Sequence, residues 1–430
     1  MARLPDLNRR QFLQRAGLIS LAGVAPRLST AESRLAFQPA AFDARHDSVL
    51  IWVGHDRPAR VQIEYKERTA TGYVRGPLLE LSDSNAYCSH ARLAGLPAGR
   101  NWEYRIIDAR TRHDLSAIGR FRTAPAAPTT FSFVFSADIS EDYRPYTLFA
   151  QMAHTRPDFF LLLGDSAYAD YPREHFKPSL AYYRGKHASI RQDVHLQEFL
   201  SQHVTYAVWD DHEVENNFHA QHPHLAQGLQ AFRDYWPCLT ETSDALYRCF
   251  TWGGVDFFVL DTRRYRSPQA MEDGPAKTML GTEQKAWFKT ALRASATPFK
   301  FVITSVPFHG GGSDTWGNYA TERDELEWFI QQEDISGVIF LTGDYHLARE
   351  FNNDVTGLHE FMAGPIASFA HFQRLPQRRE IYRSQGGFLY GDGPNFGYWN
   401  VDPKAGLATL EYLDIQGQSL FKMQISVEQK

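Results

Sequence analysis

The chain has 430 residues, enough for two domains with a sizeable core, and its 43% hydrophobic and 22% charged residues are typical of a globular protein. A net charge of -5 excludes nucleic-acid binding through bulk positive charge. No internal stretch approaches the roughly 20 apolar residues that a membrane helix needs. We therefore expect no stable nucleic-acid or membrane partner.

Residues 1–35 predict an export leader. The run Asn8-Arg9-Arg10-Gln11-Phe12-Leu13 precedes the apolar stretch AGLISLAGVA, and Ser29-Thr30-Ala31 offers small residues for cleavage. This order is typical of a twin-arginine signal, and the alternative is a basic, disordered tail. The signal predicts passage through the twin-arginine translocon and a periplasmic or extracellular location. That route carries folded proteins, often with metal already bound.

Residues 36–125 predict a small β-sandwich. Short strand-like runs such as SVLIWVGH, ARVQIEYKE and NWEYRIID follow one another at regular spacing. The stretch 93–99, followed by Tyr104, resembles the corner of fibronectin type III-like sandwiches, where a tyrosine hydroxyl ties its strand to the preceding loop. The Ala/Pro-rich run 124–128 then predicts a stiff linker.

Residues 130–430 predict a layered α/β domain. Apolar runs such as FSFVFS, DFFLLL, VTYAV and GVIFLT alternate with segments of helical periodicity, as buried parallel strands do. Toward the C-terminus the strand-like runs alternate apolar and polar residues, which indicates antiparallel strands. We expect mixed sheets covered by helices.

Three cysteines occur, at positions 88, 238 and 249, and none has CxxC spacing, so a thiolate zinc site is not expected. In an oxidising compartment Cys238 and Cys249 have two open outcomes, a disulfide that closes a short loop or two buried thiols.

Polar clusters at the ends of the apolar runs carry most of the functional information, because ligands in open α/β sheets sit beyond the carboxyl ends of the strands. The clusters are Asp138 after FSFVFSA, Asp165 and Tyr168 in GDSAY, Asp211 and His212 in WDDHE, His309 in VPFH, and Asp344 and His346 in GDYH. Carboxylates, imidazoles and a phenol at one sheet edge predict a two-metal hydrolytic centre.

The clusters do not indicate a metal site equally strongly. Three acids and a histidine in WDDHE repel one another unless a cation or a hydrogen-bond network compensates, and GDYH places two ligands on one side of an extended segment. Asp138 has the alternative of capping a helix or turn, and His309 that of a loop histidine beside a glycine run. The run Asp261-Thr262-Arg263-Arg264-Tyr265-Arg266 also ends a strand, and its arginines have two open roles, a structural ion pair or a substrate contact.

These motifs resemble the alkaline phosphatase D (PhoD-like) family of the calcineurin-like metallophosphoesterase superfamily. GDSAY, WDDHEVENN, FFVLDTRRYRS, GTEQKAWF and GDYH carry the resemblance, which covers nearly the whole chain. It implies a four-layer αββα sandwich preceded by a small fibronectin III-like β-sandwich. It also implies a phosphoric ester hydrolase, a phosphatase or phosphodiesterase that depends on metal ions.

One departure concerns the metals. Family members usually carry Ser-Cys-Gln after the first strand of the catalytic domain, whereas this chain has Ser136-Ala137-Asp138. Asp138 instead resembles the first-motif aspartate of the wider superfamily, and VPFH resembles the VxxH ligand motif of purple acid phosphatases. Iron(III) with calcium and iron(III) with another divalent cation therefore both stay open.

With this resemblance, we expect Asp138, Asp165, Tyr168 and His346 to hold one cation, with Asp165 bridging to a second. Asp211, Asp344 and, optionally, His309 complete the second position. The cations then activate a water that attacks phosphorus, His212 protonates the leaving oxygen, and Asn216 contacts a phosphate oxygen. The alternatives are a phosphodiesterase or phospholipase-type enzyme acting on envelope polymers or lipids, and a catalytically inactive exported scaffold or binding protein.

Overall fold

The computed structural model describes residues 34–240, 245–310, 312–353 and 355–427. All but the last two residues of the predicted leader lie outside these ranges. Residues 34–430 form one compact unit, and the predicted domain boundaries remain predictions. In the described part of the chain, no helix is long and apolar enough to cross a membrane.

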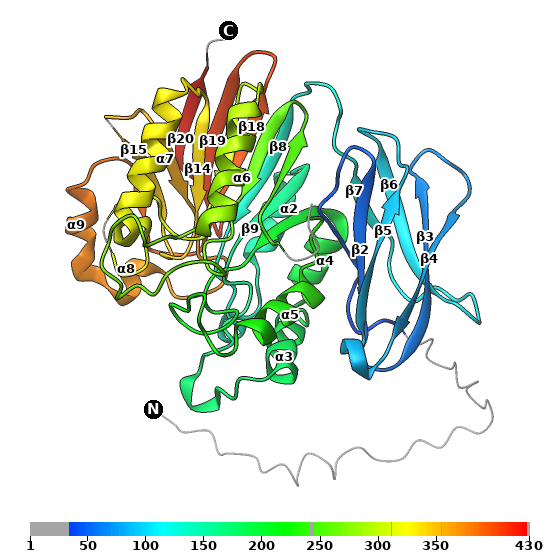
Figure 1. The fold of residues 1–430 in the computed structure, drawn as a ribbon. Helices are drawn as coiled ribbons and strands as arrows, with labels where there is room; N and C mark the ends of the chain where they lie inside the picture. The colour runs from blue at the N-terminus through cyan, green and yellow to red at the C-terminus, as the bar shows by residue number, and fades with distance from the viewer. Residues whose placement is uncertain (1–33, 241–244, 311, 354, 428–430) are drawn as a thin grey trace, which may run out of the picture. The chain divides into compact units, whose positions relative to one another are not determined.

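The N-terminal part consists of strands in two sheets, as Figure 1 shows on the blue side of the ribbon. One sheet has the order β4-β3-β6-β7, and the strands β1, β2 and β5 lie in the other. The bounds are β1 (Ala40–Phe42), β2 (Ser48–Gly54), β3 (Ala59–Glu67), β4 (Val74–Leu81), β5 (Cys88–Ala94), β6 (Asn101–Asp108) and β7 (Gly119–Arg122). This strand-rich module matches the predicted sandwich.

Tyr104 differs from the expected corner tyrosine. Its buried hydroxyl lies 3.1 Å from the carbonyl oxygen of Pro39 and 3.3 Å from that of Ser201, instead of reaching the loop that precedes its strand. Tyr104 thus connects β6 to the segment before β1 and to the C-terminal end of α4 (Val194–Gln202). Sequence spacing alone does not reveal this long-range partner.

A nine-stranded sheet with the order β20-β19-β18-β8-β9-β10-β1-β2-β5 joins the N-terminal strands to the rest. Its centre is parallel, and β1 joins β10 through the parallel pair Phe42 and Thr205. The bounds are β8 (Phe131–Ser136), β9 (Phe159–Leu163), β10 (Val204–Val208), β18 (Asn395–Asp402), β19 (Leu407–Asp414) and β20 (Ser419–Ser426). The predicted antiparallel C-terminal strands are therefore confirmed.

A second, seven-stranded sheet packs against the first. Its order is β11-β12-β13-β14-β16-β15-β17, with β12, β13, β14 and β16 parallel. The bounds are β11 (Arg248–Trp252), β12 (Val255–Val259), β13 (Lys300–Ile303), β14 (Val338–Thr342), β15 (Ala348–Asn352), β16 (His359–Met362) and β17 (Leu389–Tyr390). Phe133 of the first sheet contacts Phe257 and Phe301 of the second, with ring centroids 5.4 and 5.2 Å apart, so aromatic residues form the core between the sheets.

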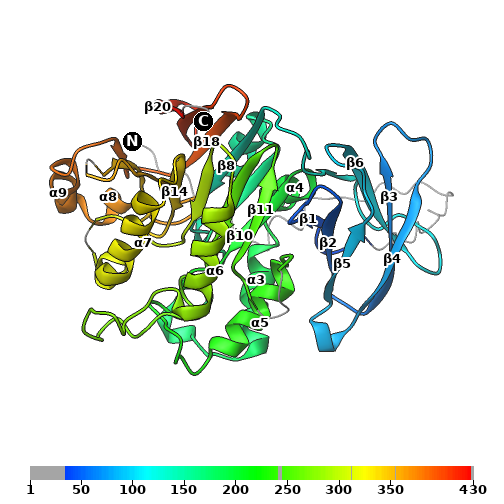
Figure 2. The same cartoon turned by 45° about the horizontal axis from the view of Figure 1, so that its top comes forward.

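Helices cover the outer faces of both sheets. In Figures 1 and 2, α6 and α7 lie against the second sheet, where Phe288 and Phe329 join a buried cluster with Phe258 and Phe340. On the first sheet, Phe149 of α2 packs 6.0 Å from Phe160 of β9. The remaining bounds are α2 (Leu148–His154), α3 (Leu180–Ile190), α5 (Leu225–Tyr235), α6 (Gly281–Ala294), α7 (Ala320–Gln332), α8 (His371–Arg374) and α9 (Arg379–Arg383). The predicted four-layer arrangement is confirmed.

None of the three cysteines forms a disulfide. Of the two outcomes left open for Cys238 and Cys249, the structure has the thiols, and the disulfide is not formed. Cys249 lies in β11, and Cys238 lies in the segment after α5, where burial raises the pKa of its thiol to about 11.

Candidate metal centre

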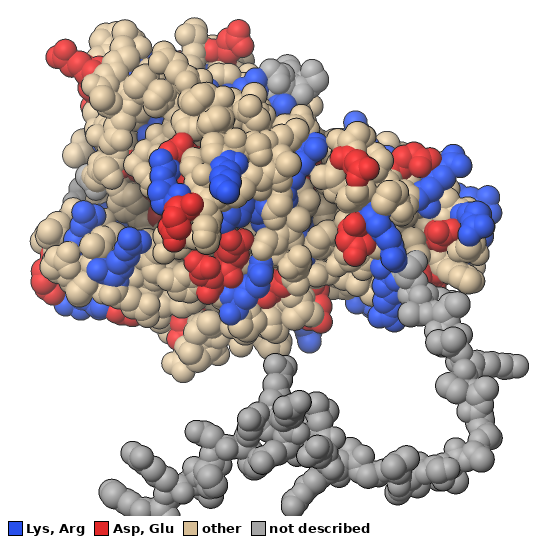
Figure 3. Space-filling view, turned by 90° about the horizontal axis from the view of Figure 1, so that it is seen from below, with Lys and Arg blue, Asp and Glu red and all other residues tan. Residues whose placement is uncertain are grey.

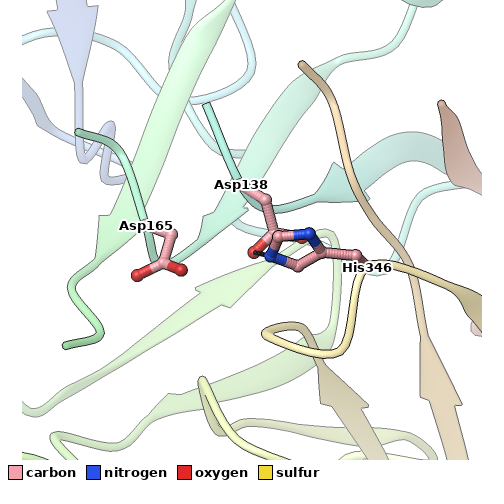
Figure 4. Close-up of side chains that lie close together, drawn as sticks. All are labelled: Asp138, Asp165 and His346. Carbon is pink, nitrogen blue, oxygen red and sulfur yellow. Dashed lines mark ion pairs between the residues drawn. The ribbon is translucent and has the colours of Figure 1, made fainter. Parts of the chain in front are cut away.

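Four strands of the two sheets deliver acidic and imidazole side chains to one place. Asp138 follows β8, Asp165 follows β9, Asp211 follows β10, and Asp344 and His346 follow β14. Potential ligand atoms lie within 4.8 Å of one another in three groups. These are Asp138, Asp165 and His346; Asp165, Asp211 and His212; and Asp165, Asp210, Asp211 and Asp344. Figure 4 shows the side chains of the first group turned toward one another.

Asp165 belongs to all three groups, which is the position expected of a ligand that bridges two cations. The sequence analysis passed over Asp210 in favour of its neighbour Asp211. The structure brings both into the third group, but Asp210 also accepts two hydrogen bonds from Arg263, at 2.6 and 2.9 Å. Asp210 is thus already neutralised by an arginine.

The backbone at the strand ends turns through an uncommon conformation. Asp138, Asp165, Asp344 and His346 have positive φ angles of 69°, 51°, 70° and 53°. Residues other than glycine rarely adopt this left-handed region, and when they do they cluster at functional sites. Gly164 makes the second turn possible, because its φ is 111° and a Cβ atom there would lie 2.6 Å from the Cβ of Asp210.

Several carboxylate oxygens of the site are buried and accept no hydrogen bond, so they are available as ligands for cations. Both oxygens of Asp138 have no hydrogen-bond partner, and neither do one oxygen each of Asp165, Asp211 and Asp344. Burial, together with repulsion from neighbouring carboxylates, raises the pKa of Asp138, Asp165 and Asp344 well above the ordinary value. Ionised carboxylates that are buried close together repel one another, so they require a compensating cation. Carboxylate oxygens and imidazole nitrogens are ligands that suit metal ions.

His346 is oriented as a nitrogen ligand. Its Nδ1 lies 2.7 Å from the carbonyl oxygen of Phe369, to which it donates, so the lone pair is on Nε2. That Nε2 lies 2.8 Å from the Tyr168 hydroxyl and 3.7 Å from Oδ1 of Asp138. Burial lowers the pKa of His346 to about 3, which keeps the ring neutral. Tyr168 and His346 therefore reach the same position.

His212 stands at the boundary between the buried carboxylates and a cleft. Its Nδ1 lies 2.6 Å from Oδ1 of Asp170, and its ring stacks on Tyr168 with centroids 4.3 Å apart. Burial lowers the pKa of His212, but Asp211, Asp165 and Asp170 outweigh burial and raise it well above its ordinary value. Asp170 was missed in the sequence, where it stands only two residues beyond Tyr168 in GDSAYAD.

The cleft next to His212 has a volume of about 1040 Å³. Asn216 lines it together with Tyr168 and His212, and the backbone N–H of Asn216 donates to Asp170 at 3.0 Å. Asn216, the predicted phosphate contact, thus lies in the cleft wall beside His212. Figure 3 looks from below, where the loops around α3, α5 and α8 lie in Figure 1, and shows basic and acidic side chains interspersed with neither sign prevailing.

His309 does not join the metal-ligand groups, and the interpretation of VPFH as a ligand motif is corrected. Its Nε2 lies 2.6 Å from Glu327 of α7, and its Nδ1 lies 3.0 Å from Glu360 of β16. Burial lowers the pKa of His309, but the two carboxylates outweigh burial and raise it to about 9. Both ring nitrogens are occupied by carboxylates that lie far away in the sequence.

Arg263 and Arg266 form structural ion pairs, which is one of the two roles left open for the arginines of the run 261–266. The fully buried guanidinium of Arg263 donates to Asp210 and, at 2.6 Å, to Asp314, and it lies 3.7 Å from Asp211. Arg266 donates to the other oxygen of Asp314 at 2.5 Å. Arg263, Arg266 and Asp314 are not among the residues that line the cleft next to His212.

Comparison with known proteins identifies the family. The family described as "PhoD-like phosphatase" matches residues 133–412, more than half of the chain, and its "PhoD-like phosphatase, N-terminal domain" matches residues 26–125. The chain belongs to the PhoD-like phosphatase family. Membership confirms the resemblance drawn from the motifs and makes the chain a phosphoric ester hydrolase that uses metal ions.

Individual relatives of this PhoD-like phosphatase agree. Alkaline phosphatase D of Bacillus subtilis (strain 168) is 29% identical over 425 residues, which cover 80% of this chain and 72% of the relative. A solved structure of PhoD superposes with a TM-score of 0.80 at 23% identity, covering 94% of this chain and 92% of the other. Purple acid phosphatase PPD1 from yellow lupin (Lupinus luteus) seeds gives 0.62 at 14% identity, with 90% and 74% covered. The two structures support the fold.

This PhoD-like phosphatase has no thiol at the position of the usual cysteine. Ala137 is fully buried, and a Cβ atom added at Gly343 would lie 2.7 Å from the Ala137 Cβ, so these two small residues pack against each other. Asp138, the next residue, contributes a carboxylate oxygen to the first group together with Asp165.

Proposed function

We propose that this PhoD-like phosphatase is exported and hydrolyses phosphate esters at a centre of at least two cations. Asp138, Asp165, Tyr168 and His346 would hold one cation, and Asp165, Asp211 and Asp344 the other. Bound cations supply Lewis acidity, which lowers the pKa of a water and offsets negative charge on the phosphoryl oxygens. The convergence of buried carboxylate oxygens without donors from four strand ends carries this proposal.

The remaining residues of the site act on the substrate and the leaving group. His212, as an imidazolium that Asp170 stabilises through Nδ1, protonates the leaving oxygen from its Nε2 and becomes neutral. Stacking on Tyr168 keeps the imidazole plane in place at the cleft wall. Asn216 binds a phosphoryl oxygen from the same wall. His309 takes no part in this assignment.

For the metals, we propose iron(III) in the position of Tyr168 and calcium or another divalent cation in the position formed by carboxylates alone. A phenolate is a hard oxygen donor that suits a trivalent ion, and carboxylate oxygens suit hard divalent ions. Elemental analysis of protein purified without chelator tests this assignment. Stoichiometric zinc in both positions would contradict it.

Export through the twin-arginine route is the second part of the proposal, and Arg9 and Arg10 support it. Cell fractionation tests it, with the activity expected outside the cytoplasm. Full retention of active enzyme in the cytoplasm would contradict export.

Two variants separate metal binding from proton transfer. Asp165→Asn should lose stoichiometric metal and lower kcat/KM for phenyl phosphate at least about 100-fold, because it removes the shared ligand. His212→Gln should keep its metal content and lower kcat about 100-fold to 10,000-fold, with the larger loss for esters of poor leaving groups. The control variants are Glu272→Gln and His46→Gln, which change exposed residues. Both should match the unmodified enzyme in metal content and in hydrolysis rate.

Unchanged metal content and rate in Asp165→Asn would refute the assignment of the centre. Wild-type protein that contains no stoichiometric metal and hydrolyses neither monoesters nor diesters would instead favour the inactive scaffold.

A further inference from the structure

The cleft beside His212 extends to a rim of exposed aromatic side chains. Tyr143, in the 3-10 turn Glu141–Tyr143, is 46% exposed, and Tyr171 is 54% exposed. Both residues line the cleft. Large aromatic side chains that stay in solvent at the edge of a cleft offer flat faces for a planar ligand group, because stacking adds to the burial of apolar area.

Arg374, the last residue of α8, contributes a positive charge to the same rim. Its guanidinium carbon lies 4.4 Å from the ring centroid of Phe369. Among the described residues, no carboxylate lies within ion-pair distance of Arg374. The other arginine of the cleft wall, Arg173, pairs with Glu215 at 2.5 Å and is therefore neutralised.

Tyr143 lies within electrostatic reach of both Tyr171 and Arg374. Burial raises the pKa of Tyr143, Tyr171 adds to this rise, and Arg374 opposes it. These three side chains come from segments after β8, β9 and β16, so they meet only in the folded chain. We refer to Tyr143, Tyr171 and Arg374 as the rim subsite.

Phe369 connects the rim subsite to the metal centre. Its ring centroid lies 4.1 Å from that of His346 and 4.4 Å from the guanidinium carbon of Arg374. An ester whose phosphorus sits at the carboxylates would then extend its leaving group along this cleft toward Arg374. His212 lines the same cleft.

We propose that the rim subsite binds the leaving group of the substrate and selects a planar ring that carries an anionic substituent. The ring stacks on Tyr143 and Tyr171, and the anionic group pairs with Arg374. The inference rests on the proposed function, because it takes phosphorus to be bound at the carboxylate centre. It adds a substrate class to that function, namely phosphate esters of anionic aromatic or heteroaromatic alcohols.

Four esters with closely similar primary alkoxide leaving groups test the rim subsite. They are benzyl phosphate, cyclohexylmethyl phosphate, 4-carboxybenzyl phosphate and 4-(aminomethyl)benzyl phosphate, each measured with the metal-loaded full chain. Comparison of the first two isolates the planar ring, and comparison of the last two isolates the charge. Calorimetric titration with 4-carboxybenzylphosphonate, which is not hydrolysed, gives a second measurement that does not depend on turnover.

Arg374→Gln should raise KM for 4-carboxybenzyl phosphate about fivefold and leave its kcat unchanged, because the lost ion pair lies away from the reacting atoms. The same variant should bind the carboxylated phosphonate about fivefold more weakly and leave benzyl phosphate unaffected. Tyr143→Ala and Tyr171→Ala should each reduce the preference for benzyl over cyclohexylmethyl phosphate about threefold to tenfold. Arg374→Lys should restore part of the charge preference.

Arg383→Gln, which removes an exposed arginine of α9 paired with Glu380, is the matched control and should change none of these values. Equal effects of Arg374→Gln on the anionic and cationic esters would overturn the proposal, as would an unchanged ring preference in both tyrosine variants. Failure of the wild-type enzyme to hydrolyse any of the four esters would refute the proposed function instead.

Discussion

At the residue scale, the position of the Asp138 carboxylate depends on its own backbone conformation and on the residues packed around it. Both of its oxygens are buried without a donor, and its backbone has a φ of 69°. Gly364 leaves room for it, since a Cβ atom at that position would lie 2.3 Å from Oδ2 of Asp138. The alternative of a capping residue is not supported, because a cap accepts a backbone hydrogen bond and these oxygens accept none.

His309 shows that a histidine can resemble a ligand in sequence and serve in an ion pair. Its folded pKa of about 9 lies above the ordinary 6.5, so the stability that it contributes is complete below pH 6.5 and is lost as pH rises to about 9. We expect the free energy of unfolding to fall by roughly 2 to 3 kcal/mol over this range from His309 alone.

His309→Gln should flatten this part of the pH profile, measured by urea denaturation at pH 6, 7.5 and 9 with saturating metal. The exposed His46→Gln serves as control and should keep the slope of the unmodified protein. Equal slopes in all three proteins would show that Glu327 and Glu360 do not hold a proton on His309.

At the scale of elements, three of the four strands, β8, β9 and β14, end in a tight left-handed turn that aims a carboxylate at a common point. Asp165 after β9 and Asp344 after β14 share this geometry, and both are preceded by glycine. The turn lets the side chain leave the strand direction at once, so residues of separate sheets meet across a short distance. If the chain continued in the direction of each strand instead, these side chains would not meet.

Gly164→Ala tests this turn. A Cβ atom at Gly164 would clash with Asp210, and alanine is strained at a φ of 111°, so we expect a loss of at least about 2 kcal/mol in unfolding free energy and a loss of bound metal.

Gly185→Ala is the matched control, because Gly185 lies within α3 and nothing occupies the space around its added Cβ. It should be neutral or stabilise the protein by up to about 1 kcal/mol. Normal metal content in Gly164→Ala, measured by elemental analysis, would show that the turn tolerates a side chain.

At the scale of the whole molecule, the N-terminal strands share buried polar contacts with the catalytic part. Arg248 of β11 donates to Asp43 at 2.9 Å, and both side chains are almost fully buried. Arg191 after α3 lies over the rings of Phe42, Trp52 and Trp236. The predicted linker at 124–128 therefore does not separate the two parts physically, since contacts on both sides of it hold them together.

Asp43→Ala should lower the free energy of unfolding by about 3 to 5 kcal/mol, because it leaves Arg248 charged and unpaired in the interior. Asp47→Ala, which removes an exposed partner of Arg92, should cost at most about 1 kcal/mol. We expect one unfolding transition by circular dichroism and by fluorescence in every variant. Two separate transitions would show that the N-terminal strands unfold independently.

Much of the site was predictable because metal ligation uses few residue types and these follow apolar strands. The acidic and imidazole residues after β8, β9, β10 and β14 were recognisable from local pattern alone. Asp170 and the partners of His309 were not, since each depends on a contact between segments that lie far apart in the sequence. The rim subsite was equally hidden, because tyrosines and arginines in loops have no periodic signal.

The sequence by itself determined the fold class, the strand-end ligands and the family, since apolar periodicity and short motifs are local properties of the chain. Only the tertiary structure decided which candidates meet. It brought Asp138, Asp165, Asp211, Asp344 and His346 together, excluded His309, kept Cys238 and Cys249 as thiols, and placed Asp170 behind His212. The physical reason is that coordination, ion pairing and disulfide formation depend on distances of a few ångströms, which packing sets and spacing along the chain does not.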